Sequence, residues 1–121
     1  MKEKKMNKNG LPEYEDFILT FSEYQKAARY TAIYPSAAEI IYPALGLAGE
    51  AGEVANKVKK MIRDNKLDRA GVASEIGDCM WYIASLATDL GLDLDDIAHD
   101  NLLKLYNRAL NNTIQGSGDE R

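Results

Sequence analysis

Two pairs of acidic residues share one spacing. Glu50 and Glu53 lie three residues apart, as do Glu75 and Asp78, and a glycine precedes the second acid of each pair. Residues three apart on a helix are neighbours on its surface, so each pair would present two carboxylates side by side. A shift of 25 residues maps one pair onto the other. The repeat indicates two copies of one half-site.

The chemistry that this pattern favours is the binding of a divalent cation. Four carboxylates gathered at one place repel each other strongly unless a cation neutralises them. Oxygen-only ligands suit hard ions, with Mg²⁺ or Mn²⁺ the natural candidates. The single histidine, His99, lies on another predicted helix, which disfavours a di-iron carboxylate bundle and a zinc site.

A simpler interpretation stays open at this point. Charged residues on the flank of a helix are usually a solvated face, and Glu53 with Lys57 makes a favourable pair four residues apart. Two copies of the acidic pair, in matching phase beside an apolar seam, favour a site over a solvated face.

Four helices are needed to position these acids. Apolar periodicity predicts them over about 20–33, 36–62, 69–90 and 93–111. Thr20 with Glu23 and Ser36 with Glu39 have capping-box spacing, while Asp93 caps the last helix and Gly91 ends the third. Pro43 predicts either a kink in the second helix or its true start. No convincing strand alternation appears, so the sequence predicts an all-α fold.

Composition narrows the class of protein. The chain has 121 residues, a net charge of −4 and one cysteine, which fits one domain that needs no disulfide. No concentration of Lys and Arg marks a nucleic-acid surface. No segment has the apolar length of a membrane span or of a signal peptide. We therefore expect a cytoplasmic protein with no nucleic-acid or membrane partner.

The residues around the acids resemble those of a known family. The segments 45–54, beginning Leu-Gly-Leu-Ala-Gly-Glu, and 75–82, beginning Glu-Ile-Gly-Asp, are similar to MazG-like nucleoside triphosphate pyrophosphohydrolases of the all-α NTP pyrophosphatase superfamily. The resemblance covers about residues 20–121, including the Gly-Ser-Gly-Asp tail at 116–119. It implies a MazG-like domain over 20–121, with a four-helix bundle-type subunit that is oligomeric. Residues 1–19 match nothing in the family and are expected to be a partly disordered extension.

The resemblance also implies a reaction. Such enzymes hydrolyse a nucleoside or deoxynucleoside triphosphate to the monophosphate and pyrophosphate. Glu50, Glu53, Glu75 and Asp78 match the family's metal ligands, which hold Mg²⁺, with Mn²⁺ as a possible substitute. The metal would neutralise phosphate charge and polarise the attacking water. Glu53 is the candidate for the base that takes the proton from that water.

Five further residues fit a triphosphate pocket. Lys57 lies one turn beyond Glu53, with the Glu53 ion pair as its alternative role. Tyr82 matches an aromatic that related enzymes place near the nucleoside. A polar stripe on the fourth helix suits phosphate oxygens, although a cation near a helix C-terminus is an alternative role for its last member. The stripe comprises Asn101, Lys104 and Arg108.

More than one oligomeric state and more than one function fit the sequence. Trp81 and several tyrosines fall outside the main apolar seam, so association of subunits would cover more apolar surface. The resembled family forms dimers or tetramers, and we therefore expect a homotetramer, with a dimer as the second choice. The alternative functions are a phosphoribosyl-ATP pyrophosphohydrolase-like enzyme and a non-enzymatic helical module that binds metal or a basic partner. The preferred base and sugar stay open.

Overall fold

The fold is all-α, as the sequence predicts. The computed structural model describes residues 5–11, 13 and 20–121, and every regular element in that part of the chain is a helix. The elements are α1 (Phe21–Arg29), the short 3₁₀ helix η2 (Ser36–Ala38), α2 (Ile41–Asp64), α3 (Arg69–Asp89) and α4 (Leu94–Leu110). Within the described ranges, none of the helices has both the length and the apolar character needed to cross a bilayer.

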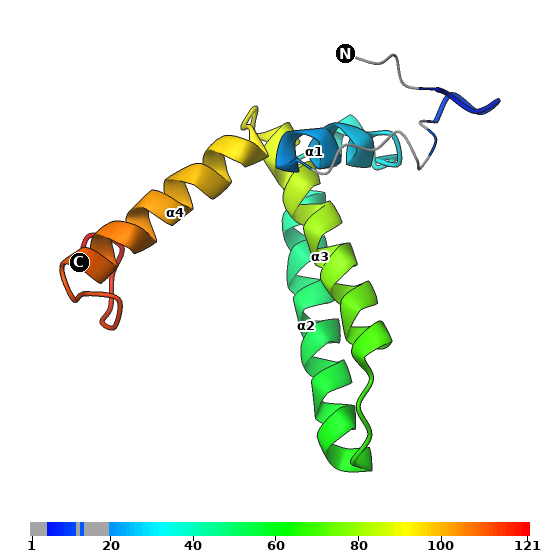
Figure 1. Ribbon diagram of the computed structural model, residues 1–121. Helices are drawn as coiled ribbons and strands as arrows, with labels where there is room; N and C mark the ends of the chain where they lie inside the picture. The colour runs from blue at the N-terminus through cyan, green and yellow to red at the C-terminus, as the bar shows by residue number, and fades with distance from the viewer. Residues whose placement is uncertain (1–4, 12, 14–19) are drawn as a thin grey trace.

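Two of the helices form an antiparallel hairpin, a third crosses one end of it, and the fourth extends away from it as an arm. α2 and α3 pack side by side along their length, α1 lies across the open end of this pair, and α4 extends away from it (Figure 1). α1 contacts both α3 and α4. The four helices therefore do not close into a bundle within one chain, which differs from the predicted bundle-type subunit. The short turn before α4 sends that helix outward instead of back along the hairpin.

Three helix starts and one helix end follow their capping signals. The side chain of Thr20 accepts a hydrogen bond from the Glu23 amide, and Asp93 accepts one from the Asp95 amide. Asp68 likewise accepts from the Gly71 amide at the start of α3. Gly91 follows α3 with a φ of +69°, a conformation that glycine adopts without strain. The predicted bounds of the third and fourth helices are confirmed to within one or two residues.

The predicted end of the first helix and start of the second are wrong. α1 stops at Arg29, four residues early, where the amide and hydroxyl of Thr31 both bond to the Ala28 carbonyl. The Ser36 capping box yields only a 3₁₀ turn, and α2 begins at Ile41. Pro43 then lies in the first turn of α2, where no backbone amide is needed. This agrees with the second of the two roles predicted for that proline.

The small core sits where α1 crosses the hairpin. Ala28, Ala84 and Leu94 are buried there, with Tyr24 and Trp81 partly buried against them. The indole nitrogen of Trp81 donates to the Thr31 hydroxyl at 2.8 Å. Trp81 therefore packs against its own chain, and it does not support the association that its place outside the seam predicted.

Other apolar side chains are left uncovered. On α4, Leu102, Tyr106 and Leu110 are 67%, 62% and 64% exposed, and on α2 Ile62 is 79% exposed. Such a concentration of exposed apolar side chains on regular helices is typical of a protein interaction surface. Leu94, at the start of α4, packs into the small core, but the rest of the helix projects from the body (Figure 1), and the described part of the chain leaves Leu102, Tyr106 and Leu110 largely uncovered.

Candidate metal centre

Three carboxylates from the two long helices meet on one side of the hairpin. Glu50 of α2 and Glu75 and Asp78 of α3 each offer an oxygen within 4.8 Å of the others. Glu50 and Glu75 are half-buried and Asp78 is exposed, so the group opens to solvent. The antiparallel packing of α2 on α3 brings the two acidic pairs level. The repeat therefore indicated correctly which helix flanks meet.

The fourth predicted acid lies outside this group. Glu53 is exposed on α2, and the three-acid group does not include it. It is still close enough to raise the pKa of Glu50 by charge repulsion. The predicted set of four thus becomes three converging carboxylates with Glu53 at their edge.

Crowding of negative charge affects the pKa of Glu50. Partial desolvation raises the pKa of Glu50 above its ordinary value, and repulsion from Asp78 and Glu75 raises it further, together with a hydrogen bond to Glu75. A carboxylate surrounded in this way is stabilised in its charged form by any cation placed among the three oxygens. The donor set therefore fits a hard divalent ion.

A lysine from α2 partly offsets this charge. Lys57 Nζ lies 3.9 Å from Glu75 Oε1, so its ion pair crosses to α3 and does not involve Glu53 as the simpler interpretation expected. Lys57 also lines a cavity of about 330 Å³ toward the loop end of the hairpin, together with Lys60 and Lys66. Asp64 and Asp68 line the same cavity, so the positive charge that lies against the clustered acids is that of Lys57.

An aromatic cluster borders the acids on their other side. Tyr82 lies one turn after Asp78 on α3, and its ring is 6.3 Å from that of Tyr42 on α2. Gly46 is what allows this packing, because a Cβ at that position would lie 2.2 Å from the Tyr82 ring. The sequence singled out Tyr82 but not Gly46, whose signal is only that it lies one helical turn before Glu50.

The predicted phosphate stripe on α4 is not brought to the acids within one chain. Asn101 and Lys104 are exposed on the arm that leaves the hairpin. Arg108 is 6% exposed, because the C-terminal tail covers it: Nη2 donates to the Asp119 carbonyl at 2.9 Å. Lys104 Nζ lies 3.8 Å from the Asp119 carboxylate. The tail thus takes up the two cations that sequence reasoning assigned to substrate.

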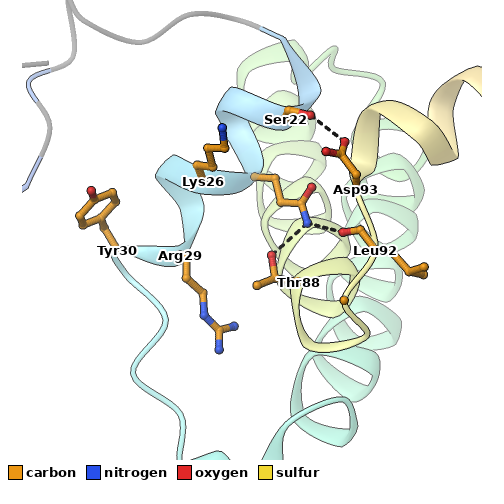
Figure 2. A pocket seen from close by; sticks show the side chains of 9 residues that line it. Ser22, Lys26, Arg29, Tyr30, Thr88, Leu92 and Asp93 are labelled. Carbon is orange, nitrogen blue, oxygen red and sulfur yellow. Dashed lines mark hydrogen bonds between the residues drawn. The ribbon is translucent and has the colours of Figure 1, made fainter. Parts of the chain in front are cut away.

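A separate cavity lies between α1 and the turn that precedes α4. It measures about 710 Å³ and includes Lys26, Arg29 and Tyr30 in its lining (Figure 2). Gln25, at its wall, donates to the Thr88 hydroxyl and the Leu92 carbonyl and accepts from the Leu94 amide. None of the three clustered acids lines this cavity, so it is separate from the candidate metal centre.

Comparison with known proteins identifies the family of the chain. A family model described as "MazG nucleotide pyrophosphohydrolase domain" matches residues 43–112, which include all four acids. The chain is 46% identical over 109 residues to "Gene 37 protein" of Mycobacterium phage L5, covering 81% of this chain and 96% of that protein. No solved structure matches the chain. By these matches the chain belongs to the MazG nucleotide pyrophosphohydrolase family.

Proposed function

We propose that the protein is a Mg²⁺-dependent enzyme that hydrolyses a nucleoside or deoxynucleoside triphosphate to the monophosphate and pyrophosphate, for nucleotide-pool control or house-cleaning. The observation that carries the proposal is the three-carboxylate group between α2 and α3, in a chain of the MazG family. Mg²⁺, with Mn²⁺ as a substitute, suits these oxygen donors.

Glu50, Glu75 and Asp78 would hold the metal. When bound, the ion would neutralise phosphate charge and polarise water. The raised pKa of Glu50 supports this assignment, since repulsion among the three acids is what a cation would relieve.

The neighbouring residues would orient the substrate. Tyr82, on the side of the acids toward α1, would border the nucleoside, and Lys57, on the side toward the loop, would contact phosphate by exchanging its ion pair with Glu75. Glu53, exposed beside Glu50, is our candidate for the group that takes the proton from the attacking water.

A second copy of the chain would complete the site. The exposed apolar side chains of α4 need a partner, and the cation stripe beside them lies away from the acids of its own chain. Packing of α4 on a neighbouring subunit would cover the apolar side chains and could bring Asn101 and Lys104 to that subunit's substrate. We propose a homotetramer, with a dimer as the second choice; a light-scattering mass of one 13.4 kDa chain would contradict both.

A substrate panel tests the proposed reaction. Each common NTP and dNTP, and phosphoribosyl-ATP, is incubated with protein and Mg²⁺, and pyrophosphate and monophosphate are quantified. Equal release of both products from one or more nucleoside triphosphates supports the proposal. Turnover confined to phosphoribosyl-ATP would select that alternative enzyme. Absence of turnover, or release of inorganic phosphate alone, would refute the proposal and favour a non-enzymatic helical module.

A further inference from the structure

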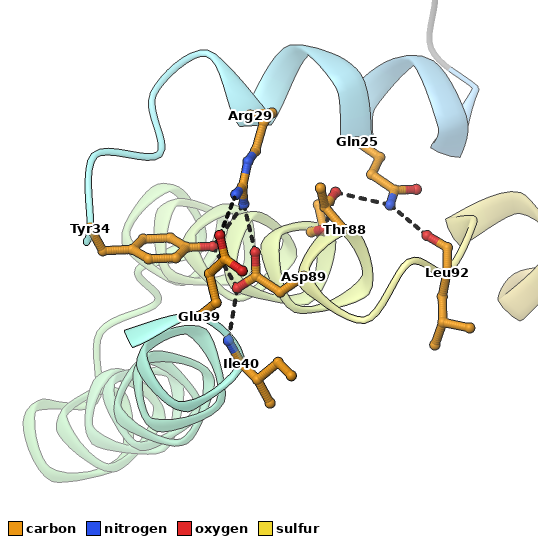
Figure 3. A network of polar contacts seen from close by, with 9 residues as sticks. Gln25, Arg29, Tyr34, Glu39, Ile40, Thr88, Asp89 and Leu92 are labelled. Carbon is orange, nitrogen blue, oxygen red and sulfur yellow. Dashed lines mark hydrogen bonds and ion pairs between the residues drawn. The ribbon is translucent and has the colours of Figure 1, made fainter. Parts of the chain in front are cut away.

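A buried carboxylate ties together the open end of the hairpin. α2 and α3 are joined by the loop at 65–68, whereas their other ends meet at Asp89, the last residue of α3. Asp89 accepts hydrogen bonds from Arg29 Nη1 at 2.8 Å, the Tyr34 hydroxyl at 2.8 Å and the Ile40 amide at 2.9 Å (Figure 3). Its side chain is 0% exposed. A single group thus connects α1, the segment after it and the start of α2 to α3.

The residue before α2 is held in a strained conformation. Ile40 has φ +68° and ψ −54°, and the Ile41 amide donates to the Glu39 carbonyl at 2.7 Å. These values define a classic γ-turn, which is rare, and a β-branched residue at positive φ is an outlier. Strain of this kind persists only where surrounding contacts impose it. The bond from the Ile40 amide to Asp89 is such a contact.

A continuous set of ring contacts leads from this tie to the acids. Tyr34, bonded to Asp89, stacks on Tyr42 at 4.9 Å between ring centroids. Tyr42 in turn lies 6.3 Å from Tyr82, whose ring packs over Gly46. On α2, Glu50 lies one turn beyond Gly46. On α3, Asp78 lies one turn before Tyr82 and belongs to the same acid group as Glu50.

We propose that Asp89 and the Ile40 turn are positioning elements that set the register of α2 against α3. A slip of one residue along a helix moves a side chain by about 1.5 Å and turns it by about 100°. That is enough to remove Glu50 from a group whose oxygens lie within 4.8 Å of one another. The inference rests on the proposed function in one respect, namely that the acid group binds a metal.

Two variants separate positioning from simple stabilisation. Asp89→Asn weakens the tie while keeping the size of the side chain. Ile40→Gly removes the strain, because glycine adopts positive φ freely, but leaves the turn flexible. We expect its melting temperature to stay within about 3 °C of wild type. Asp100→Asn is the matched control, since Asp100 is exposed on α4 and, among the described residues, pairs with its neighbour His99 at 3.7 Å.

Two measurements are made on the full chain. Hydrogen exchange of the metal-free protein should be about tenfold faster over residues 41–50 in both test variants. A Mn²⁺ titration, in which electron paramagnetic resonance detects free Mn²⁺, should give a dissociation constant raised about tenfold, the usual effect of losing a group that orients metal ligands. The control should match wild type in both.

The outcomes decide between the two roles. Faster exchange with weaker Mn²⁺ binding, in an Ile40→Gly protein that melts like wild type, supports positioning. Unchanged exchange, or Mn²⁺ affinity within twofold of wild type in both variants, overturns it. If wild-type protein binds no Mn²⁺, the proposed function is contradicted, and the exchange rates alone decide whether Asp89 sets the start of α2.

Discussion

Substitution of Gly46 by alanine tests the close contact between Gly46 on α2 and the Tyr82 ring on α3. A Cβ at position 46 would lie 2.2 Å from Tyr82 Cε1, whereas ordinary contact begins at about 3.4 Å. The Tyr82 ring must therefore retreat by about 1 Å. It is bounded by Tyr42 and by Trp81, whose ring centroid is 5.1 Å away. The added methyl group is thus expected to strain the cluster.

The size of the effect follows from two opposing contributions. Alanine in place of glycine inside a helix gains about 1 kcal/mol from backbone propensity. Overpacking at a filled position costs about 1–3 kcal/mol. Gly49→Ala is the matched control, because a Cβ at position 49 would meet no atom of the described residues within 4 Å outside its own stretch of helix. The two variants should therefore differ by about 2 kcal/mol in the free energy of unfolding, with Gly46→Ala the less stable.

Urea unfolding of five proteins measures this difference. They are wild type, Gly46→Ala, Tyr82→Ala and the double variant, with Gly49→Ala alongside. Once the Tyr82 ring is removed, Gly46→Ala should change from destabilising to stabilising, because only the helix propensity remains. Equal effects of the alanines at 46 and 49, or no change of sign in the Tyr82→Ala background, would refute the assigned contact.

Three further predictions concern charge. Glu50→Gln should raise the melting temperature of the metal-free protein at pH 7 and abolish Mn²⁺ binding, because the raised pKa of Glu50 means that its charged form opposes folding; a lower melting temperature would contradict this. Burial alone would raise the pKa of Asp89, but its hydrogen bonds outweigh burial and lower it. The stability that Asp89 contributes is therefore present above pH ~3.9 and is lost as the pH falls through the pKa of Asp89 in the folded protein. The loss of stability with falling pH, monitored by circular dichroism, should therefore be less steep in Asp89→Asn than in wild type. Arg121→Ala should free the C-terminal tail, because the Arg121 side chain donates to the carbonyls of residues 113, 114 and 118, and proteolysis at 113–120 should become faster; an unchanged rate would show that other contacts hold the tail.

Local signals in the sequence predicted the helices well where one residue determines the outcome. The caps at Thr20 and Asp93 and the glycine at 91 needed only their immediate neighbours. The start of α2 was indicated by Pro43 only as one of two alternatives. It depends on Asp89, which lies 49 residues from Ile40 in the sequence and meets it only after folding.

The candidate site shows the same division. The spacing of the acids identified the helix flanks that meet, because helical periodicity fixes which residues share a face. It did not show that Glu53 would stay at the edge, or that Lys57 would pair with Glu75, since both depend on how one helix packs on the other. The hydrogen-bond partner of Arg108 is set by the fold of the C-terminal tail, for which the sequence offers no periodic signal.

The most direct test of the central claim compares wild type and Glu50→Gln in one reaction. The nucleoside triphosphate turned over best by wild type is incubated with Mg²⁺, and its products are followed by phosphorus NMR, with Asp100→Asn as the control. We predict equal amounts of monophosphate and pyrophosphate from wild type and control, and a rate at least about a hundredfold lower from folded Glu50→Gln. Equal rates from wild type and Glu50→Gln would contradict the assignment of the acid group as the metal centre.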